Sequence, residues 1–245
     1  MMLFDRLKTA AAQDWADYTR HDFILQLEAG TLPLAAFRNY LIQDYLFLIQ
    51  FGRANALAAY KGHTLADLTA AQRGLAAVIE ETELHVRLCA GWGLSREDLN
   101  AAAEHPATIA YTRYVLDSGL RGDLLDIHVA LSPCTIGYAE IGAALQPALE
   151  SNPDHPYADW ISEYASEPFQ QVARESAAYI DELGGRFLGD PEANPQRFAA
   201  LTNTFATATR MESAFWQMGL DLGAAEQDGA ERGGAEQGGA RVGAA

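Results

Sequence analysis

The sequence has few cysteines, few basic residues and no long hydrophobic run. The two cysteines among its 245 residues, Cys89 and Cys134, are too few for a disulfide scaffold and lack the CxxC spacing of a structural zinc site, which predicts a reducing, cytoplasmic environment. Lys and Arg total 17 against 33 Asp and Glu, and the net charge of −16 argues against binding to nucleic acid or to an anionic membrane surface. No window approaches the roughly 18 uncharged apolar residues of a membrane span, and the first residues alternate apolar and charged side chains, unlike a secretion signal.

Strand-length runs of β-branched residues are also scarce, and helical periodicity takes their place. Across residues 1–221 apolar side chains recur at spacings of three and four, which predicts an all-α protein. Gly, Pro and Asn punctuation divides this region into helices over 2–18, 21–29, 33–61, 64–88, 95–102, 106–119, 122–149, 154–162, 165–184 and 194–220. Because no segment between them is long enough to be a linker, we expect residues 1–221 to form a single multi-helix bundle.

The C-terminal residues 222–245 differ in composition. From residue 223 onward there are seven Gly, seven Ala and an imperfect GAEQ/GAER repetition, with Val242 the one large apolar side chain. Such a segment cannot bury enough apolar surface to offset the entropy of ordering it, so we expect a disordered tail. A solvated appendage without chemistry and a partner-binding tail are the two interpretations.

Two acidic residues interrupt apolar helix faces. Asp44 lies within a stripe of large apolar side chains on the 33–61 helix, and Glu212 lies within a second stripe on the 194–220 helix. An unpaired buried charge costs several kcal/mol, so each acid needs a partner, a raised pKa or a ligand. A buried arginine or a helix cap would satisfy either acid separately, but two such acids on distant helices favour one shared polar cavity.

A proline and a cysteine interrupt the 122–149 helix at SPCTIGYAEIG, residues 132–142. Pro133 either kinks the helix or restarts it, and a restart would place Cys134 at a helix N-terminus, where the dipole favours a thiolate. In both cases Tyr138 lies one turn from Cys134. A buried cysteine that only packs is the alternative, and Cys89 has no comparable surroundings.

Ten tyrosines are the last unusual feature. Tyr111 and Tyr114 lie together on one predicted helix, and Tyr157 and Tyr164 flank Trp160. Most are expected in the core or at an interface, with their hydroxyls hydrogen-bonded. A planar polar heterocycle would also use such side chains, with rings stacked on its faces and hydroxyls bonded to its nitrogens.

Four stretches, 21–51, 131–142, 157–169 and 205–216, together resemble the TenA/thiaminase II family over essentially all of residues 1–220. The resemblance implies a haem-oxygenase-like helical fold. It implies hydrolysis of an aminopyrimidine: release of ammonia from 4-amino-5-aminomethyl-2-methylpyrimidine, or slower cleavage of thiamin, to give hydroxymethylpyrimidine for thiamin salvage. It also implies a homotetramer and a reaction without a metal or other cofactor.

The resemblance assigns roles to residues already noted. By position, Cys134 would be the nucleophile, Glu212 the acid and base, and Asp44 the anchor of the ring's amino edge. The pocket would be lined by Tyr111, Tyr138, Tyr164 and Phe47. Phe47 departs from the family, because many members carry there a tyrosine that helps to activate the cysteine. We therefore expect Cys134 to be a less activated nucleophile, and Tyr45, about 100° away around the helix from Asp44, does not replace that tyrosine.

Three alternatives remain at this stage. A haem oxygenase would need a proximal histidine, for which His21 is the candidate. A di-iron oxygenase would combine Glu81 and His85, spaced i and i+4, with one more ligand: Glu140, Asp126 or His128. A regulator or carrier would keep the pocket without turnover.

A face around Trp15 and Tyr18 is predicted to be exposed and to suit a subunit interface.

Overall fold

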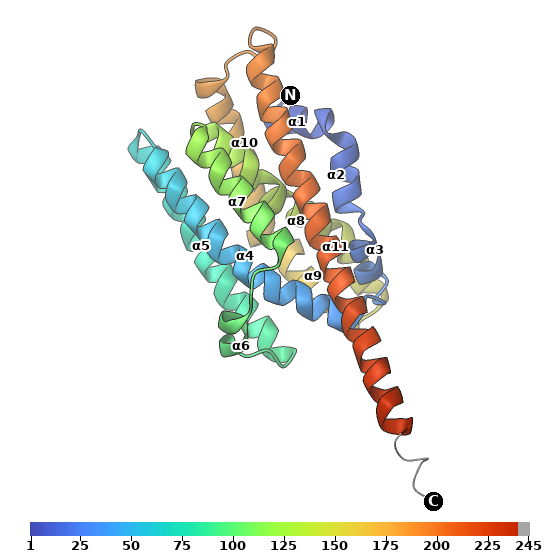
Figure 1. The fold of residues 1–245 in the computed structure, drawn as a ribbon. Helices are drawn as coiled ribbons and strands as arrows, with labels where there is room; N and C mark the ends of the chain where they lie inside the picture. The colour runs from blue at the N-terminus through green and yellow to red at the C-terminus, as the bar shows by residue number, and fades with distance from the viewer. Residues whose placement is uncertain (240–245) are drawn as a thin grey trace, which may run out of the picture.

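Eleven helices and no strand make up the part of the chain that the structure describes, which confirms the predicted all-α class. The computed structural model describes residues 1–239, with side chains as far as Glu226. The helices are α1 (Leu3–Ala10), α2 (Ala12–Thr19), α3 (Asp22–Glu28), α4 (Leu34–Lys61), α5 (Leu65–Gly91), α6 (Arg96–Ala101), α7 (Pro106–Arg121), α8 (Leu124–Ser151), α9 (Ala158–Ala165), α10 (Glu167–Phe187) and α11 (Pro195–Gly239). They form one bundle, which α11 crosses and then leaves (Figure 1). Within the described residues, no helix has the length and hydropathy needed to cross a bilayer.

Nine of the ten predicted spans correspond to one helix each, and the span 2–18 corresponds to two. The chain turns between α1 and α2 at Ala11, whose φ of −112° and ψ of 32° lie outside the helical range. Neither glycine nor proline marks this turn. Instead, α1 packs against α10 and α11 while α2 packs against α8 and α11, so tertiary packing sets the boundary.

Trp15 and Tyr18 are buried, at 3% and 0% exposure, so the prediction that they form an exposed face was wrong. The ring of Trp15 stacks on Phe205 with 5.6 Å between centroids. The Tyr18 hydroxyl donates to the carbonyl of Pro133 at 3.3 Å. Both contacts exist because α2 lies against α8 and α11 instead of facing solvent. The homotetramer stays a prediction.

The centre of the bundle is aromatic. Trp216 of α11 lies 5.0 Å, centroid to centroid, from Phe23 and 5.2 Å from both Tyr40 and Tyr138. These rings come from α3, α4 and α8, so one side chain holds four helices together. Packing of this kind contributes area burial plus about 0.5–1.5 kcal/mol for each well-placed aromatic pair.

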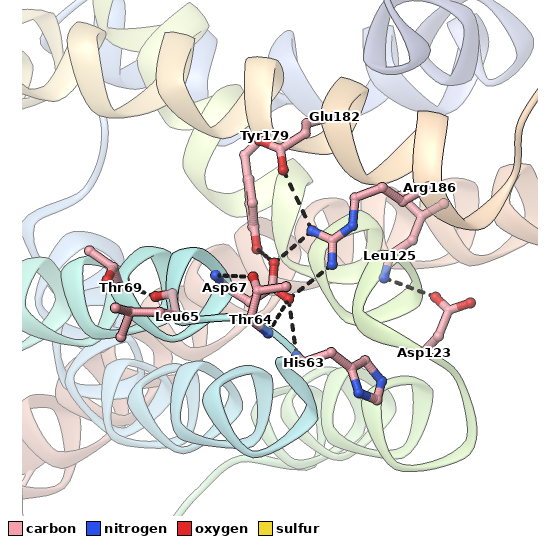
Figure 2. Close-up of polar contacts among 10 residues, drawn as sticks. All are labelled: His63, Thr64, Leu65, Asp67, Thr69, Asp123, Leu125, Tyr179, Glu182 and Arg186. Atoms are coloured by element: carbon pink, nitrogen blue, oxygen red, sulfur yellow. Dashed lines mark hydrogen bonds and ion pairs between the residues drawn. The ribbon is translucent and has the colours of Figure 1, made fainter.

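Asp67 joins the start of α5 to α10 (Figure 2). It forms a capping box with Thr64 and also accepts from the His63 backbone N–H at 3.0 Å. Arg186 of α10 donates to both of its oxygens, at 2.6 and 2.9 Å, and Tyr179 donates at 3.2 Å. The Asp67 side chain is fully buried, and Arg186 holds the pKa of this carboxyl well below its usual value. The cluster is a structural clamp that fixes α5 against α10.

The last helix continues beyond the predicted domain boundary at residue 221. Gly223 packs so closely on Ala36 that an added Cβ would lie 2.6 Å from the Ala36 nitrogen, and Asn39 donates to Glu226 at 3.1 Å. Helix is described as far as Gly239. The predicted disordered tail, 222–245, therefore begins within α11, and residues 240–245 lie outside the described residues.

We expect Asp67→Asn to lower the free energy of unfolding by about 3 kcal/mol, because it leaves Arg186 without its buried partner. The folded-state pKa of Asp67 is depressed, so its contribution is present above its unfolded pKa of about 4 and is lost as the pH falls. The difference between wild type and variant, measured by urea unfolding, should therefore shrink in acid. The matched control is Asp117→Asn, which removes an exposed pair with Arg121 and should change stability by less than about 0.5 kcal/mol. Equal losses for the two variants would contradict the clamp.

Candidate active site

Asp44 is buried, at 4% exposure, and no arginine or lysine among the described residues pairs with it. Its Oδ2 accepts a hydrogen bond from Tyr40, one turn earlier on α4, at 3.0 Å. The Tyr40 oxygen in turn accepts from the indole N–H of Trp160 at 3.1 Å. Burial raises the pKa of Asp44 to about 7, although the Tyr40 hydrogen bond opposes the rise. Asp44 is therefore a buried acid that sits close to its ionisation point.

His85 lies beside Asp44 without neutralising it. Its Nδ1 is 3.5 Å from Asp44 Oδ2, and its Nε2 is 2.7 Å from the carbonyl of Leu41, which assigns the ring proton to Nε2. Burial lowers the pKa of His85 to about 4, so the ring is neutral at physiological pH. His85 therefore supplies no positive charge to the Asp44 carboxyl.

Glu212 repeats this arrangement on α11. It is 2% exposed, and its Oε1 accepts from the Tyr111 hydroxyl of α7 at 2.7 Å. Burial raises its pKa to about 8, which the Tyr111 hydrogen bond opposes and the charge of Asp44 reinforces. No cation among residues 1–226 pairs with Glu212, so the second predicted acid also lacks a counter-ion.

Glu81 is a third acid, which the sequence had assigned only to a metal alternative. It is half-buried on α5, and its Oε1 accepts from the Tyr164 hydroxyl of α9 at 3.2 Å. Burial raises its pKa to about 8, and the charge of Asp44 adds to the rise. The usable signal was the spacing of Val78, Glu81, His85 and Cys89, which places Glu81 on the inward face of its helix.

Cys134 lies in the middle of a helix. α8 is continuous through Pro133, so the alternative in which the helix restarts and Cys134 gains from an N-terminal dipole was wrong. Proline has no N–H for the carbonyl of Val129, and the Ser132 hydroxyl donates to that carbonyl instead, at 2.8 Å. This substitution of one donor for another lets the helix pass through the proline.

The charges of all three acids act on the Cys134 thiol. Burial raises its pKa well above the usual value, and the charges of Glu212, Glu81 and Asp44 raise it further, in that order. The group is therefore a thiol, not a thiolate, at neutral pH, and a reaction at sulfur has to remove its proton. The acids and the thiol come from α4, α5, α8 and α11, and the tyrosines come from α4, α7, α8 and α9.

Aromatic rings form the walls of this cluster. The ring of Tyr138 lies 5.0 Å from Tyr164 and 6.0 Å from Trp160. Phe47 lies 4.9 Å from the ring of Tyr111, the residue that holds Glu212. Tyr45 points elsewhere and donates to Asn100 at 2.7 Å. All predicted pocket residues thus border the same cluster, and their roles in binding or catalysis stay predictions.

The residues proposed as metal or haem ligands do not lie together in the structure. Among the described residues, no three His, Cys, Asp or Glu side chains are arranged to hold a metal ion. The residues proposed to complete a di-iron site with Glu81 and His85 are engaged elsewhere: Glu140 pairs with Lys8, Asp126 pairs with Arg197, and His128 packs edge-on against Tyr179. His21, the haem candidate, caps α3 by accepting from the Phe23 N–H at 3.2 Å.

A groove of about 380 Å³ between α4 and α5 lies apart from the acid cluster. It is lined mainly by apolar side chains, including the exposed Ile49 and Ile79, and by none of the three acids that surround Cys134. We therefore do not include this groove in the candidate site.

Comparison with known proteins agrees with this fold. The fold is shared with a domain of haem-oxygenase-like fold from Shewanella denitrificans, at 17% identity and a TM-score of 0.65 over 87% of this chain and 92% of the other. The chain matches the TENA/THI-4/PQQC family over residues 9–222 and belongs to that family.

Three similar proteins carry different names. A TenA family transcription regulator from Silicibacter sp. TM1040 is 42% identical over 89% of this chain and 96% of its own, with a TM-score of 0.84. An uncharacterised protein of Haemophilus influenzae is 40% identical over 90% of this chain and 100% of its own. An aminopyrimidine aminohydrolase of Halalkalibacterium halodurans is 35% identical over 83% of this chain and 89% of its own.

The raised pKa of Cys134 predicts slow alkylation by iodoacetamide at neutral pH, with a rate that climbs above about pH 9 as thiolate forms. Glu212→Gln removes the largest of the charges that raise this pKa and should move the midpoint of the pH–rate curve to lower pH. The measurement is made in a Cys89→Ala background, so that Cys134 is the one thiol. An unchanged midpoint in Glu212→Gln would show that the acid does not act on the thiol.

Proposed function

We propose that the chain is an aminopyrimidine hydrolase. It releases ammonia from 4-amino-5-aminomethyl-2-methylpyrimidine and, more slowly, cleaves thiamin, and both reactions give hydroxymethylpyrimidine. The observation that carries the proposal is the Cys134 thiol among buried, tyrosine-held carboxyl groups with which no cation of residues 1–226 pairs. Family membership and the 35% identical aminopyrimidine aminohydrolase support it.

An aminopyrimidine supplies the groups that this cluster lacks. The ring is flat, basic at nitrogen and rich in N–H donors, so it complements aromatic walls and carboxyl oxygens. Asp44 accepts from the exocyclic amino edge, and Glu212 bonds a ring nitrogen on the opposite edge. With pKa values near 7 and 8, both acids can exchange a proton with the ring at physiological pH.

The reaction begins with a proton transfer from Glu212, which carries a proton at neutral pH because its pKa is raised, to the ring nitrogen. The resulting carboxylate takes the proton of the Cys134 thiol, and sulfur adds to the unsubstituted ring carbon next to the one that bears the exocyclic methylene. The electron pair gained by the ring expels the leaving group from the methylene. Water then adds to that carbon and loses one proton, which balances the proton carried off by ammonia, and the sulfur leaves as Cys134 and then Glu212 recover theirs.

A non-catalytic regulator is the second candidate, favoured by the name of the 42% identical structure. Such a protein would need the acids and the aromatic walls for binding. It would have no use for a thiol on which the charges of all three acids act, and for that reason we favour the enzyme.

Formation of hydroxymethylpyrimidine from a panel of aminomethylpyrimidine, its formylated precursor and thiamin tests the proposal. We expect wild-type turnover and a loss on the order of 1,000-fold in Cys134→Ala, because covalent catalysis is abolished. Cys89→Ala, which alters the other buried cysteine, is the matched control and should retain activity. Tight binding of the pyrimidine with no turnover in wild type would establish the regulator instead.

Phe47→Tyr tests the departure from the family pattern. A hydroxyl at this position, beside the ring of Tyr111, would add a hydrogen-bonding group near Glu212 and Cys134, so we expect kcat for ammonia release to rise severalfold with KM little changed. Phe51→Tyr, one turn away at 5.6 Å from the Phe47 ring, is the control and should leave kcat unchanged. A lower or equal kcat in Phe47→Tyr would reject the idea.

A further inference from the structure

One of the two carboxyl oxygens of Glu81 has no hydrogen-bond partner among the described residues. Its Oε1 accepts from Tyr164, and no hydrogen bond reaches its Oε2 among the described residues. Among residues 1–226, the side-chain oxygens and nitrogens that are both unbonded and fully enclosed belong to His128, Thr202 and Trp216, so the second oxygen of Glu81 faces space that a solvent-sized group can enter.

The same pattern holds for all three acids. Tyr40 bonds one oxygen of Asp44, Tyr111 bonds one oxygen of Glu212, and each carboxyl keeps its other oxygen free. A bound aminopyrimidine ring occupies two of them, with Asp44 at the amino edge and Glu212 at the opposite ring nitrogen. The proposed mechanism leaves Glu81 without a task.

The substrate also has one group without a partner. In 4-amino-5-aminomethyl-2-methylpyrimidine the aminomethyl group is on the carbon next to the one that bears the amino group. The acid that binds the aminomethyl nitrogen must therefore be a neighbour of the acid that binds the amino edge. Glu81 meets this condition: it lies one helical turn before His85, whose Nδ1 is 3.5 Å from Asp44, and Asp44 is the charge that acts on it most strongly.

We propose that Glu81 binds the aminomethyl nitrogen of the substrate and carries the proton with which that nitrogen leaves. The assignment rests on the proposed function and adds to it the residue that selects a primary amine as the leaving group.

Glu81 supplies the proton that the leaving amine needs and takes one back from the water that replaces it. The Glu81 carboxyl gives its proton to the neutral amine, and the resulting ammonium pairs with the carboxylate. The C–N bond breaks with its electron pair on nitrogen, so the group departs as ammonia. The water that adds to the methylene gives its proton to the Glu81 carboxylate, which restores the acid.

Thiamin makes no such demand. Its leaving group is a thiazolium, which departs as a neutral thiazole without taking up a proton and has no N–H to donate to a carboxylate. Glu81 therefore separates the two reactions, whereas Cys134 and Glu212 serve both.

The test compares both reactions in Glu81→Gln. We expect kcat/KM for ammonia release to fall about 100-fold, the usual effect of losing a positioned acid, while thiamin cleavage stays within about threefold of wild type. Retained thiamin cleavage also shows that the variant is folded. Glu81→Asp keeps a carboxyl and should recover part of the ammonia release, and the pH dependence of ammonia release should lose one ionisation in Glu81→Gln but not in Glu81→Asp.

Glu80→Gln is the matched control, because Glu80 is the exposed acid next to Glu81 on α5, and both reactions should be unchanged. Equal losses in both reactions for Glu81→Gln, or no loss in either, would overturn the assignment while leaving the proposed function standing. A wild-type protein inactive on both compounds would instead overturn the proposed function itself.

Discussion

The structure depends on holding three carboxyl groups inside an aromatic bundle without a positive charge beside them. Asp44, Glu81 and Glu212 each give one oxygen to a tyrosine hydroxyl, and burial raises the pKa of each by several units. Such groups are stable there because they can be neutral, and because each tyrosine satisfies one oxygen. The arrangement keeps the remaining oxygens available, at the cost of some stability, for a ligand that brings its own positive character.

The rest of the fold fixes these groups in place. Glu81 and Asp44 are on α5 and α4, which pack side by side, and the Asp67–Arg186 clamp ties the start of α5 to α10. Cys134 reaches the acids from a helix that passes through a proline, because Ser132 takes over the missing hydrogen bond. Tyr164 comes from the short α9. The Asp67–Arg186 and Tyr164–Glu81 contacts join elements far apart in sequence, so the site exists only in the folded bundle.

The sequence predicted the helices and two of the acids for one reason: periodicity exposes an acid that sits among large apolar side chains, as Asp44 and Glu212 do. Glu81 was not predicted as a site residue, because it lies in a run of acids whose other members, Glu80 and Glu83, are exposed. The state of Cys134 could not be predicted either, since it depends on whether Ser132 can replace a donor and on charges from three other helices. The turn at Ala11 has no local signal at all.

Because these carboxyl groups are protonated at neutral pH, binding of a ligand is linked to transfer of a proton. With pKa values of about 7, 8 and 8, the carboxyl groups of Asp44, Glu81 and Glu212 at neutral pH already hold the protons that a weak base would accept. An uncharged amine takes one of them up and leaves the buffer unaltered. A fixed cation such as thiazolium has to displace one into the medium, so its affinity declines as the solution is acidified.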